Sequence, residues 1–495
     1  MKTIISCFLK ISVMLRTLFL LLFCVFSFVT VSLGQLQEDE FFKGNWVDTA
    51  GYKGYEFPAD TFNVMDYGAR NNGIELTTQH IQAALDDCAQ SGGGVVIVPE
   101  GMFLTGSIYI GSNTHLLFAD STRIYASMEL EDYPEQLTRV AGIEMQWPQA
   151  LININDAENV KISGHAIING RGRVFWNKFD YMRPIYIEND LRWAVDYDAK
   201  RPRMLVANNA SNLLINDITL IESPFWTLHV LYSEMVTVDG VTINNAVEVR
   251  APSTDGINID SSRDILVQNN VVSAKDDNFC IKSGRDADGM RVNRPSEYIV
   301  IRNNTTLEGA ALIAFGSEVA GGINHVYVQN MKADGTSRGI RFKSARTRGG
   351  LIENILMEDI EIKNTPFAFE FTLDWNPEYS YTSLPDGFDY ESVPDHWRTL
   401  LQDVPEEKGL TKLRNVTIRN ATVSGNSWKA FYVEGFEEMP IENFIFENVT
   451  VRTQTAGEIL NANGWRTINS QFFYDDNEAP EMINTENMDS FFTPK

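Results

Sequence analysis

Asn212-Leu-Leu-Ile215 is one copy of a short pattern that decides the fold of this chain. Each copy is a strand of four or five residues, rich in Val and Ile and bounded by Asn, Asp or Gly, which favour bends. Most copies start about 23 to 34 residues after the previous one, and two gaps are roughly twice as long. The other copies begin at Asn159, Met235, Asp264, Tyr298, His325, Ile352, Asn415 and Asn443.

A repeat of this length predicts a solenoid. A unit this short cannot bury its apolar face alone, so the copies must stack to form one continuous core. The strands alternate at period two and no helical pattern lies between them, which disfavours leucine-rich repeats and βα units. A β-propeller would need four strands per blade and a longer period. We therefore predict an all-β fold, a parallel β-helix with Asn at its bends.

Residues 78–91 predict a helix that caps the stack, because an open β-helix end would expose strand edges and core. Thr77 or Thr78 is the expected N-cap, and Gly92 to Gly94 end the helix before a strand at 95–98. The apolar residues at helical spacing are Ile81, Ala84, Leu85 and Cys88.

Three segments break the repeat, near residues 129–150, 176–203 and 365–400. They contain many of the aromatic residues of the chain, so we expect loop insertions whose rings pack together. Long loops on a rigid scaffold often carry binding residues, and one or two of these rings are expected to stack on a sugar. The remainder of 60–495 is expected to be a single β-helix domain.

The first 34 residues have the pattern of a secretory signal. Lys2, Lys10 and Arg16 flank or precede an apolar run over 18–28, which ends near small residues. A membrane anchor is the alternative, but the run is shorter than the roughly 20 residues that a span needs. We expect a protein that is secreted or periplasmic and not attached to the membrane, with residues 35–59 as an N-terminal extension.

The charge balance restricts the partners. The chain has 41 Lys and Arg against 66 Asp and Glu, a net charge of −25, and removal of the three basic signal residues makes it −28. Such a surface argues against nucleic acid and anionic membranes as partners. Cys88 and Cys280 remain after the signal, too far apart in sequence for a disulfide to be predicted. We expect a monomer.

Three aspartates are predicted to share one side of the stack. One coil further along the sequence is one layer of about 4.8 Å, so residues at equal phase stand side by side. Asp276 follows Asp255 after 21 residues, and Asp277 comes next. Asp276 and Ala310 each lie 11 residues after an Ile of the preceding strand, which indicates equal phase. A single Asp in such a chain is usually a bend residue, but three together predict a column of carboxyl groups.

Carboxyl groups this close raise one another's pKa, which keeps at least one protonated near neutral pH. A protonated acid beside an ionised base is what cleavage of a glycosidic bond requires: the acid protonates the leaving oxygen and the base activates water. Bases spread over two layers leave room for that water, which favours inversion. The column therefore predicts a glycoside hydrolase.

Basic residues follow in the next coils. Arg338, Arg341, Lys343, Arg346 and Arg348 are five cations within 11 residues. Such a run is usually a solvated strand face. Beside the aspartates, however, it offers partners for the carboxylate of a uronic acid, and an acidic polysaccharide is the expected ligand. We predict that Arg341, Lys343 and Arg338 bind substrate. Further cations that extend the patch are Lys282, Arg285, Arg291 and Arg294.

Over roughly residues 60 to 450 the sequence resembles glycoside hydrolase family 28, the polygalacturonases and rhamnogalacturonan hydrolases. The resemblance implies a single-stranded right-handed parallel β-helix, inverting hydrolysis, and no metal or other cofactor. It also implies that Asp276 is the general acid, that Asp255 and Asp277 activate water, and that Arg341 and Lys343 bind a galacturonate carboxylate. The matching segments are 62–68, 164–176, 223–229, 253–256, 276–284, 315–318 and 338–343.

Three positions depart from the family pattern. Ser253 replaces an Asn, Lys275 replaces a Gly, and Ala310 stands where the family has a histidine. An ion pair of Lys275 with Asp276 would lower the pKa of the proposed acid, the wrong direction for a proton donor.

Because the histidine is absent, several functions stay open. The leading one is hydrolysis of α-linked galacturonan or rhamnogalacturonan, with exo action if the long loops block the cleft. The alternatives are a hydrolase of another acidic or sulfated galactan, a β-helix polysaccharide lyase, and a carbohydrate-binding relative without turnover.

Overall fold

The computed structural model describes residues 42 and 44–494. The chain divides into two compact units, Met1–Thr49 and Ala50–Lys495. Of the first unit, the short helix α2 (Asn45–Thr49) is described, and the expected signal segment lies outside the described residues. Within the described part of the chain, no helix has the length and apolar character needed to cross a membrane.

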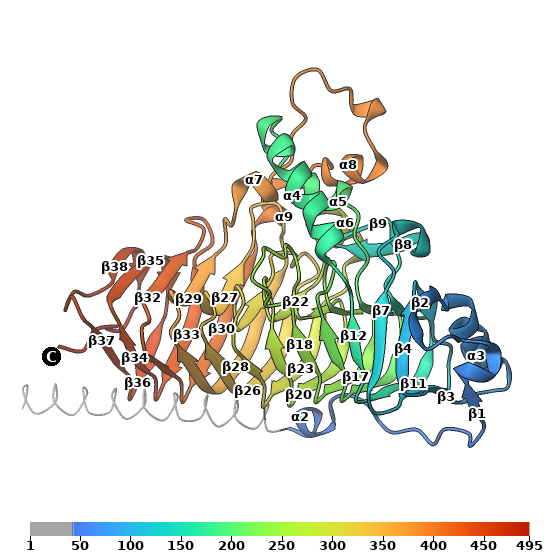
Figure 1. The fold of residues 1–495 in the computed structure, drawn as a ribbon. Helices are drawn as coiled ribbons and strands as arrows, with labels where there is room; N and C mark the ends of the chain where they lie inside the picture. Colours follow the sequence, from blue (N-terminus) through green and yellow to red (C-terminus); the bar gives the residue numbers. More distant parts are fainter. Residues whose placement is uncertain (1–41, 43, 495) are drawn as a thin grey trace, which may run out of the picture. The chain divides into compact units, whose positions relative to one another are not determined.

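Residues 50–494 form a right-handed parallel β-helix, which confirms the predicted fold (Figure 1). Each coil contributes short strands to three parallel ladders. We call the ladder that carries the aspartates the site sheet; its strands include β13 (Leu205–Asn208), β16 (Leu228–Leu231), β19 (Ile257–Asp260), β22 (Phe279–Lys282), β25 (Ile313–Phe315), β27 (Arg338–Lys343), β29 (Phe367–Thr372), β32 (Lys429–Glu434) and β35 (Thr455–Asn463).

The other two ladders complete each coil. The second sheet includes β11 (Glu158–Gly164), β14 (Ser211–Asn216), β17 (Glu234–Asp239), β20 (Arg263–Gln268), β23 (Ser296–Arg302), β26 (Ile323–Asp334), β28 (Leu351–Lys363), β30 (Lys412–Arg419) and β33 (Ile441–Glu447). The third includes β12 (Ile167–Asn169), β15 (Thr219–Ile221), β18 (Thr242–Asn244), β21 (Val271–Ser273), β31 (Thr422–Ser424), β34 (Thr450–Thr453) and β37 (Gln471–Tyr474).

The repeated pattern marks a bend in the second sheet. Asn159 and Asn212 adopt the left-handed conformation, with φ of 55° and 54°. Asn enters this region more readily than most residues because its short polar side chain bonds locally. The Asn212 side chain donates to Asn159 Oδ1 at 2.8 Å, so successive bends are joined by an amide ladder. In the copy at Ile352 the left-handed residue is Asn354, which donates to Asn324 at 3.0 Å.

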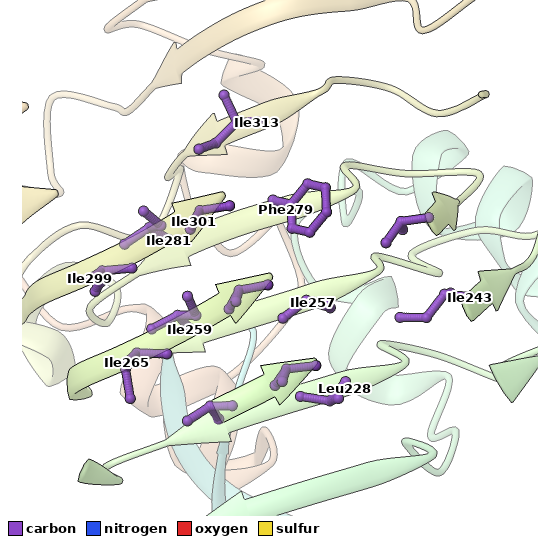
Figure 2. Packing of buried hydrophobic residues seen from close by; sticks show 14 of the residues in the cluster. Leu228, Ile243, Ile257, Ile259, Ile265, Phe279, Ile281, Ile299, Ile301 and Ile313 are labelled. Carbon is purple, nitrogen blue, oxygen red and sulfur yellow. The ribbon is translucent and has the colours of Figure 1, made fainter. Parts of the chain in front are cut away.

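The core is a set of stacked aliphatic columns. Figure 2 shows Ile257, Phe279 and Ile313 on neighbouring strands of the site sheet, and the register pairs them in that order. Ile265 and Ile299 form an equivalent pair on the second sheet and are fully buried. Burying one such side chain contributes about 1.5–3 kcal/mol. The in-register stack therefore fixes which outward residues become neighbours.

The predicted cap is α3 (Thr78–Gln90), and its four predicted apolar residues are all buried. The strand expected after it is β3 (Gly94–Val98), which pairs with β1 (Thr61–Asn63) and β6 (Thr114–Phe118). The helix and the first coils therefore close the N-terminal end of the core.

The three insertions are more ordered than the predicted loops. The first contains an antiparallel hairpin, β8 (Glu135–Val140) and β9 (Ile143–Pro148). The second contains α4 (Arg173–Glu188) and α5 (Val195–Asp198). Figure 1 shows α4, α5 and the helices of the third insertion gathered on one side of the coils.

The predicted start of the third insertion, at residue 365, is wrong. Residues 367–372 form β29, a regular strand of the site sheet, with Phe369 and Phe371 buried in the core. Its aromatic residues follow the same period-two pattern as any other strand. The segment that leaves the stack starts after β29 and holds α7 (Pro377–Ser380), α8 (Asp395–Leu400) and α9 (Glu406–Gly409).

Candidate active site

The register of the site sheet brings the three aspartates together. Asp255 lies two residues before Ile257 and Asp277 two residues before Phe279, and these strand residues are paired in adjacent layers. The Gly256 N–H donates to the Asp277 carbonyl at 3.0 Å, so the pairing extends into the turn. The Ala310 N–H likewise donates to the Asp276 carbonyl at 2.9 Å, as the equal phase predicted.

Asp277 is the ionised member of the cluster. It is fully buried, and burial by itself would raise its pKa. Lys343 Nζ donates to it at 2.6 Å and Arg341 Nη1 at 3.3 Å. These two cations outweigh burial and hold the pKa of the Asp277 carboxyl well below its usual range.

Asp255 and Asp276 are shifted in the opposite direction. Burial and the neighbouring charge of Asp276 raise the pKa of Asp255 to about 8. Burial and the charge of Asp277 raise the pKa of Asp276 as well. The cluster therefore combines one carboxylate with two groups that hold a proton readily, the separation of roles that acid–base chemistry needs.

The expected ion pair between Lys275 and Asp276 is not formed. Lys275 Nζ instead donates to Glu308 Oε2 at 2.8 Å, and both side chains are partly exposed. The cations with the largest effect on the pKa of Asp276 are instead Lys343, Arg341 and Lys282. The expectation that this lysine lowers the pKa of the acid was wrong, because its side chain turns to the next coil.

A cavity of about 200 Å³ opens over the aspartates. Asp255 and Asp276 reach it from the site sheet, together with Lys282 and Lys343. The insertions form other parts of its wall: Ala141, Arg192, Asp196, Trp375, Asn376 and Tyr379.

The predicted substrate cations have different positions. Lys343 lines the cavity. Arg341 is nearly buried beneath it, bonded to Asp277 and, through Nε, within 2.7 Å of Glu370. Arg338 donates to Glu370 at 2.6 Å and does not line the cavity. Arg285 is fully buried and serves as a structural contact.

Lys282 and Glu318 form a second charged pair in the cavity wall. Lys282 Nζ lies 3.0 Å from Glu318 Oε2, 3.8 Å from Asp255 Oδ2, and 5.0 Å from the centre of the Trp226 ring. Lys282, with other cations, lowers the pKa of Glu318 despite burial. Tyr379 donates to Glu318 at 3.2 Å, which joins this pair to the third insertion.

Sequence reasoning did not single out the cavity residues of the insertions. Arg192, which bonds to Asp196 at 2.6 Å, was not considered. Trp375, over which Lys343 lies at 4.6 Å, was one of many aromatic residues of the third insertion, of which one or two were expected to contact the ligand. Cys280 was considered only as a disulfide candidate; it is a buried free thiol that donates to Asp255 at 3.4 Å. Its outward place on β22, beside Asp255, was available from the period-two pattern.

This parallel β-helix, with clustered aspartates beside cations in a cavity, has the architecture and site of a glycoside hydrolase. The family model described as "Glycosyl hydrolases family 28" matches residues 88–370, more than half of the chain, and the chain belongs to this family.

Relatives and solved structures agree with this assignment. A probable polygalacturonase of Vitis vinifera is 27% identical over 458 residues, which cover 90% of this chain and 82% of the relative. An exo-poly-α-D-galacturonosidase of Dickeya chrysanthemi is 25% identical over 78% of this chain and 66% of its own length. The exopolygalacturonase of Thermotoga maritima superposes with a TM-score of 0.69 at 25% identity, covering 81% of this chain and 89% of that one.

Proposed function

We propose that this protein hydrolyses α-linked galacturonate bonds of pectic polysaccharide by an inverting acid–base mechanism. The observation that carries the proposal is the cluster of three aspartates. Asp255 and Asp276 line the cavity and have a raised pKa. Asp277 is held ionised by Lys343 and Arg341. Relatives named polygalacturonases support the choice of substrate.

Asp276 is the proposed general acid. It is half-buried and lines the cavity, and burial and the charge of Asp277 raise its pKa, the direction that suits a proton donor. It gives that proton to the glycosidic oxygen as the bond to the anomeric carbon breaks. A water molecule attacks that carbon from the opposite face and passes a proton to the carboxylates of Asp255 and Asp277. A proton on Asp276 removes the charge that contributes to the raised pKa of Asp255, so Asp255 ionises more easily when the acid is loaded.

The cavity also suggests how the substrate is held. Lys343 and Arg192 are cavity-lining cations that suit the carboxylate of a uronic acid. Its volume of about 200 Å³ is below the roughly 300–1,000 Å³ of a site for a drug-sized ligand, and suits one sugar ring. Because three insertions contribute to its wall, we infer that the enzyme removes residues from a chain end.

The location and organisation are part of the same proposal. The basic residues and apolar run of the first 34 residues support export, so that the protein is secreted or periplasmic. We propose that it acts as a monomer with one catalytic β-helix over 60–495. Pectic substrates are polymers outside the cytoplasm, which is consistent with export.

The proposal is tested with Asp276→Asn, which keeps the shape of the side chain and removes the proton donor. We expect release of reducing sugar from polygalacturonate to fall about 10²- to 10⁴-fold, with the melting temperature retained. Asp120→Asn, an exposed turn residue, is the control and should act like the wild type. Proton NMR of the first product should give the inverted anomer. Unchanged activity in Asp276→Asn would refute the mechanism; binding without any product would favour a non-catalytic carbohydrate-binding protein.

A further inference from the structure

The column that carries the aspartates continues beyond the cavity. The register of the site sheet aligns Asp255 and Asp277 with the residues that start β27, β29 and β32. Arg338 pairs with Phe367, and Phe367 pairs with Lys429. Lys429 is four layers from Asp277, which is about 19 Å at roughly 4.8 Å per layer. One line of aligned residues therefore runs from the acid–base cluster towards the C-terminal coils.

Aromatic rings gather at the far end of this line. The Trp428 ring packs edge-on against Phe367 at 5.3 Å, and Phe367 lies 5.9 Å from the Tyr432 ring. The Trp428 side chain is 44% exposed, although tryptophan is usually buried, and its backbone N–H is bonded to Thr365. We call Phe367, Trp428, Lys429 and Tyr432 the distal platform.

Cations lie close to the aromatic rings of the distal platform. Lys429 Nζ is 5.4 Å from the centre of the Trp428 ring and 5.5 Å from that of Tyr432, and the Arg338 guanidinium lies 5.3 Å from the centre of the Phe367 ring. Lys429 Nζ donates to the Glu458 carboxylate at 3.4 Å. Because an ammonium group has three N–H donors, this contact does not use all of them. Exposed rings flanked by cations suit a sugar ring that carries a carboxylate, since the ring face packs on apolar sugar carbons and the cation meets the charge.

We infer that the distal platform binds a stretch of acidic polysaccharide several sugars away from the bond that is cut. The identity of the polymer in this inference rests on the proposed function. The chain end occupies the cavity, and the rest of the polymer follows the column across β25, β27 and β29 to Trp428. Between the aspartates and Arg338 this column holds the small residue Ala311, with Ala310 beside it, and neither adds a long side chain to the column.

The first experiment compares long and short substrates. In Trp428→Ala we expect the KM for polygalacturonate to rise about 3- to 10-fold with kcat unchanged, the loss expected for one aromatic contact. Kinetics on digalacturonate, too short to reach the platform, should stay the same. Trp428→Phe should restore most of the affinity. The control is Phe473→Ala: Phe473 is a half-buried ring beside a cation, Arg452, but it lies on the third sheet.

A binding measurement separates this inference from the proposed function. Retardation of the protein in gels that contain polygalacturonate is measured for the wild type, Trp428→Ala and Phe473→Ala. Reduced retardation in Trp428→Ala alone supports the platform, even if the wild type releases no sugar and the proposed function fails. The inference would be overturned if all three proteins were retarded equally and had the same KM on the polymer. It would also be overturned if the wild type were not retarded at all.

Discussion

The stacked coils and the insertions contribute to the same cavity, but different forces fix their side chains. In the coils, a residue's position follows from strand register: Asp255 and Asp277 are neighbours because Ile257 and Phe279 are paired. In the insertions, position depends on single long-range contacts, such as the bond from Arg285 to the Tyr197 hydroxyl at 2.9 Å. The coils thus supply the reacting groups, and the insertions supply the shape of the space in which they act.

This difference explains the tolerance expected of each region. Most coil strands are bonded to two neighbours and packed over a continuous core, so the loss of one contact is compensated by many others. The insertions return to the stack at few points. A change that removes one anchor should therefore release a whole insertion while leaving the coils intact, and the predictions below test that contrast.

The largest effect is expected from Lys343→Met, which removes a charge from the coil-built cluster and keeps most of the side-chain length. Asp277 would lose its contact at 2.6 Å and keep only Arg341, so its pKa should rise. The activity on polygalacturonate should fall about 10²- to 10⁴-fold. Initial rates across pH measure this, and the residual activity should require a higher pH than that of the wild type.

The same variant has a defined effect on acid stability. The folded-state pKa of Asp277 lies below its unfolded value of about 3.9, so its ion pairs stabilise the fold above that pH and are lost as pH falls through the folded pKa. With a higher folded pKa, Lys343→Met should lose less stability than the wild type as the pH falls below about 3.9, and that loss should be complete at a higher pH. Lys275→Met is the control: its partner is Glu308, so both profiles should match the wild type. A large loss of activity in Lys275→Met would contradict this assignment.

The sequence was sufficient for the parts of the site that the repeat fixes. The spacing of Asp255, Asp276 and Ala310 predicted their layers, and the basic run in the following coils placed Lys343 beside the aspartates. It was not sufficient for Arg192, Trp375 or Tyr379, because an insertion has no internal period from which a position can be read. The direction of the Lys275 side chain also depends on a partner in the next coil.

An intermediate effect is expected from Arg285→Ala, which removes an anchor shared by the insertions. Arg285 donates to Tyr197 and to the Tyr379 carbonyl at 2.9 Å, and Tyr197 in turn donates to Ala141 at 2.7 Å. Losing these buried contacts should lower the free energy of local opening by about 1–3 kcal/mol per unsatisfied group. Hydrogen exchange measures this: amides of α5 and α7 should exchange faster, while those of β19 and β22 stay protected.

The control for Arg285 is Arg346→Ala. Arg346 is in the same basic run as Lys343, but its side chain is 43% exposed and pairs with Glu438, which is 54% exposed. A surface pair of this kind contributes little to stability, because water screens both charges. Equal exchange changes in the two variants, or loss of protection in the coil strands of Arg285→Ala, would mean that coils and insertions open as one unit.

The smallest effect concerns a bend of the coils and compares Asn354→Gly with Asn354→Ala. Asn354 has a φ of 56°, and both variants lose its bond to Asn324. Alanine must also occupy the left-handed region, which costs roughly 1–2 kcal/mol, whereas glycine enters it freely. The glycine variant should therefore unfold at a higher denaturant concentration than the alanine variant. At Thr422, an exposed strand residue without positive φ, the order should reverse, because glycine in a strand is less stable than alanine by about 0.5–1 kcal/mol. If the alanine variant were more stable than the glycine variant at both positions, Asn354 would act through its amide ladder alone and not through the conformation of the bend.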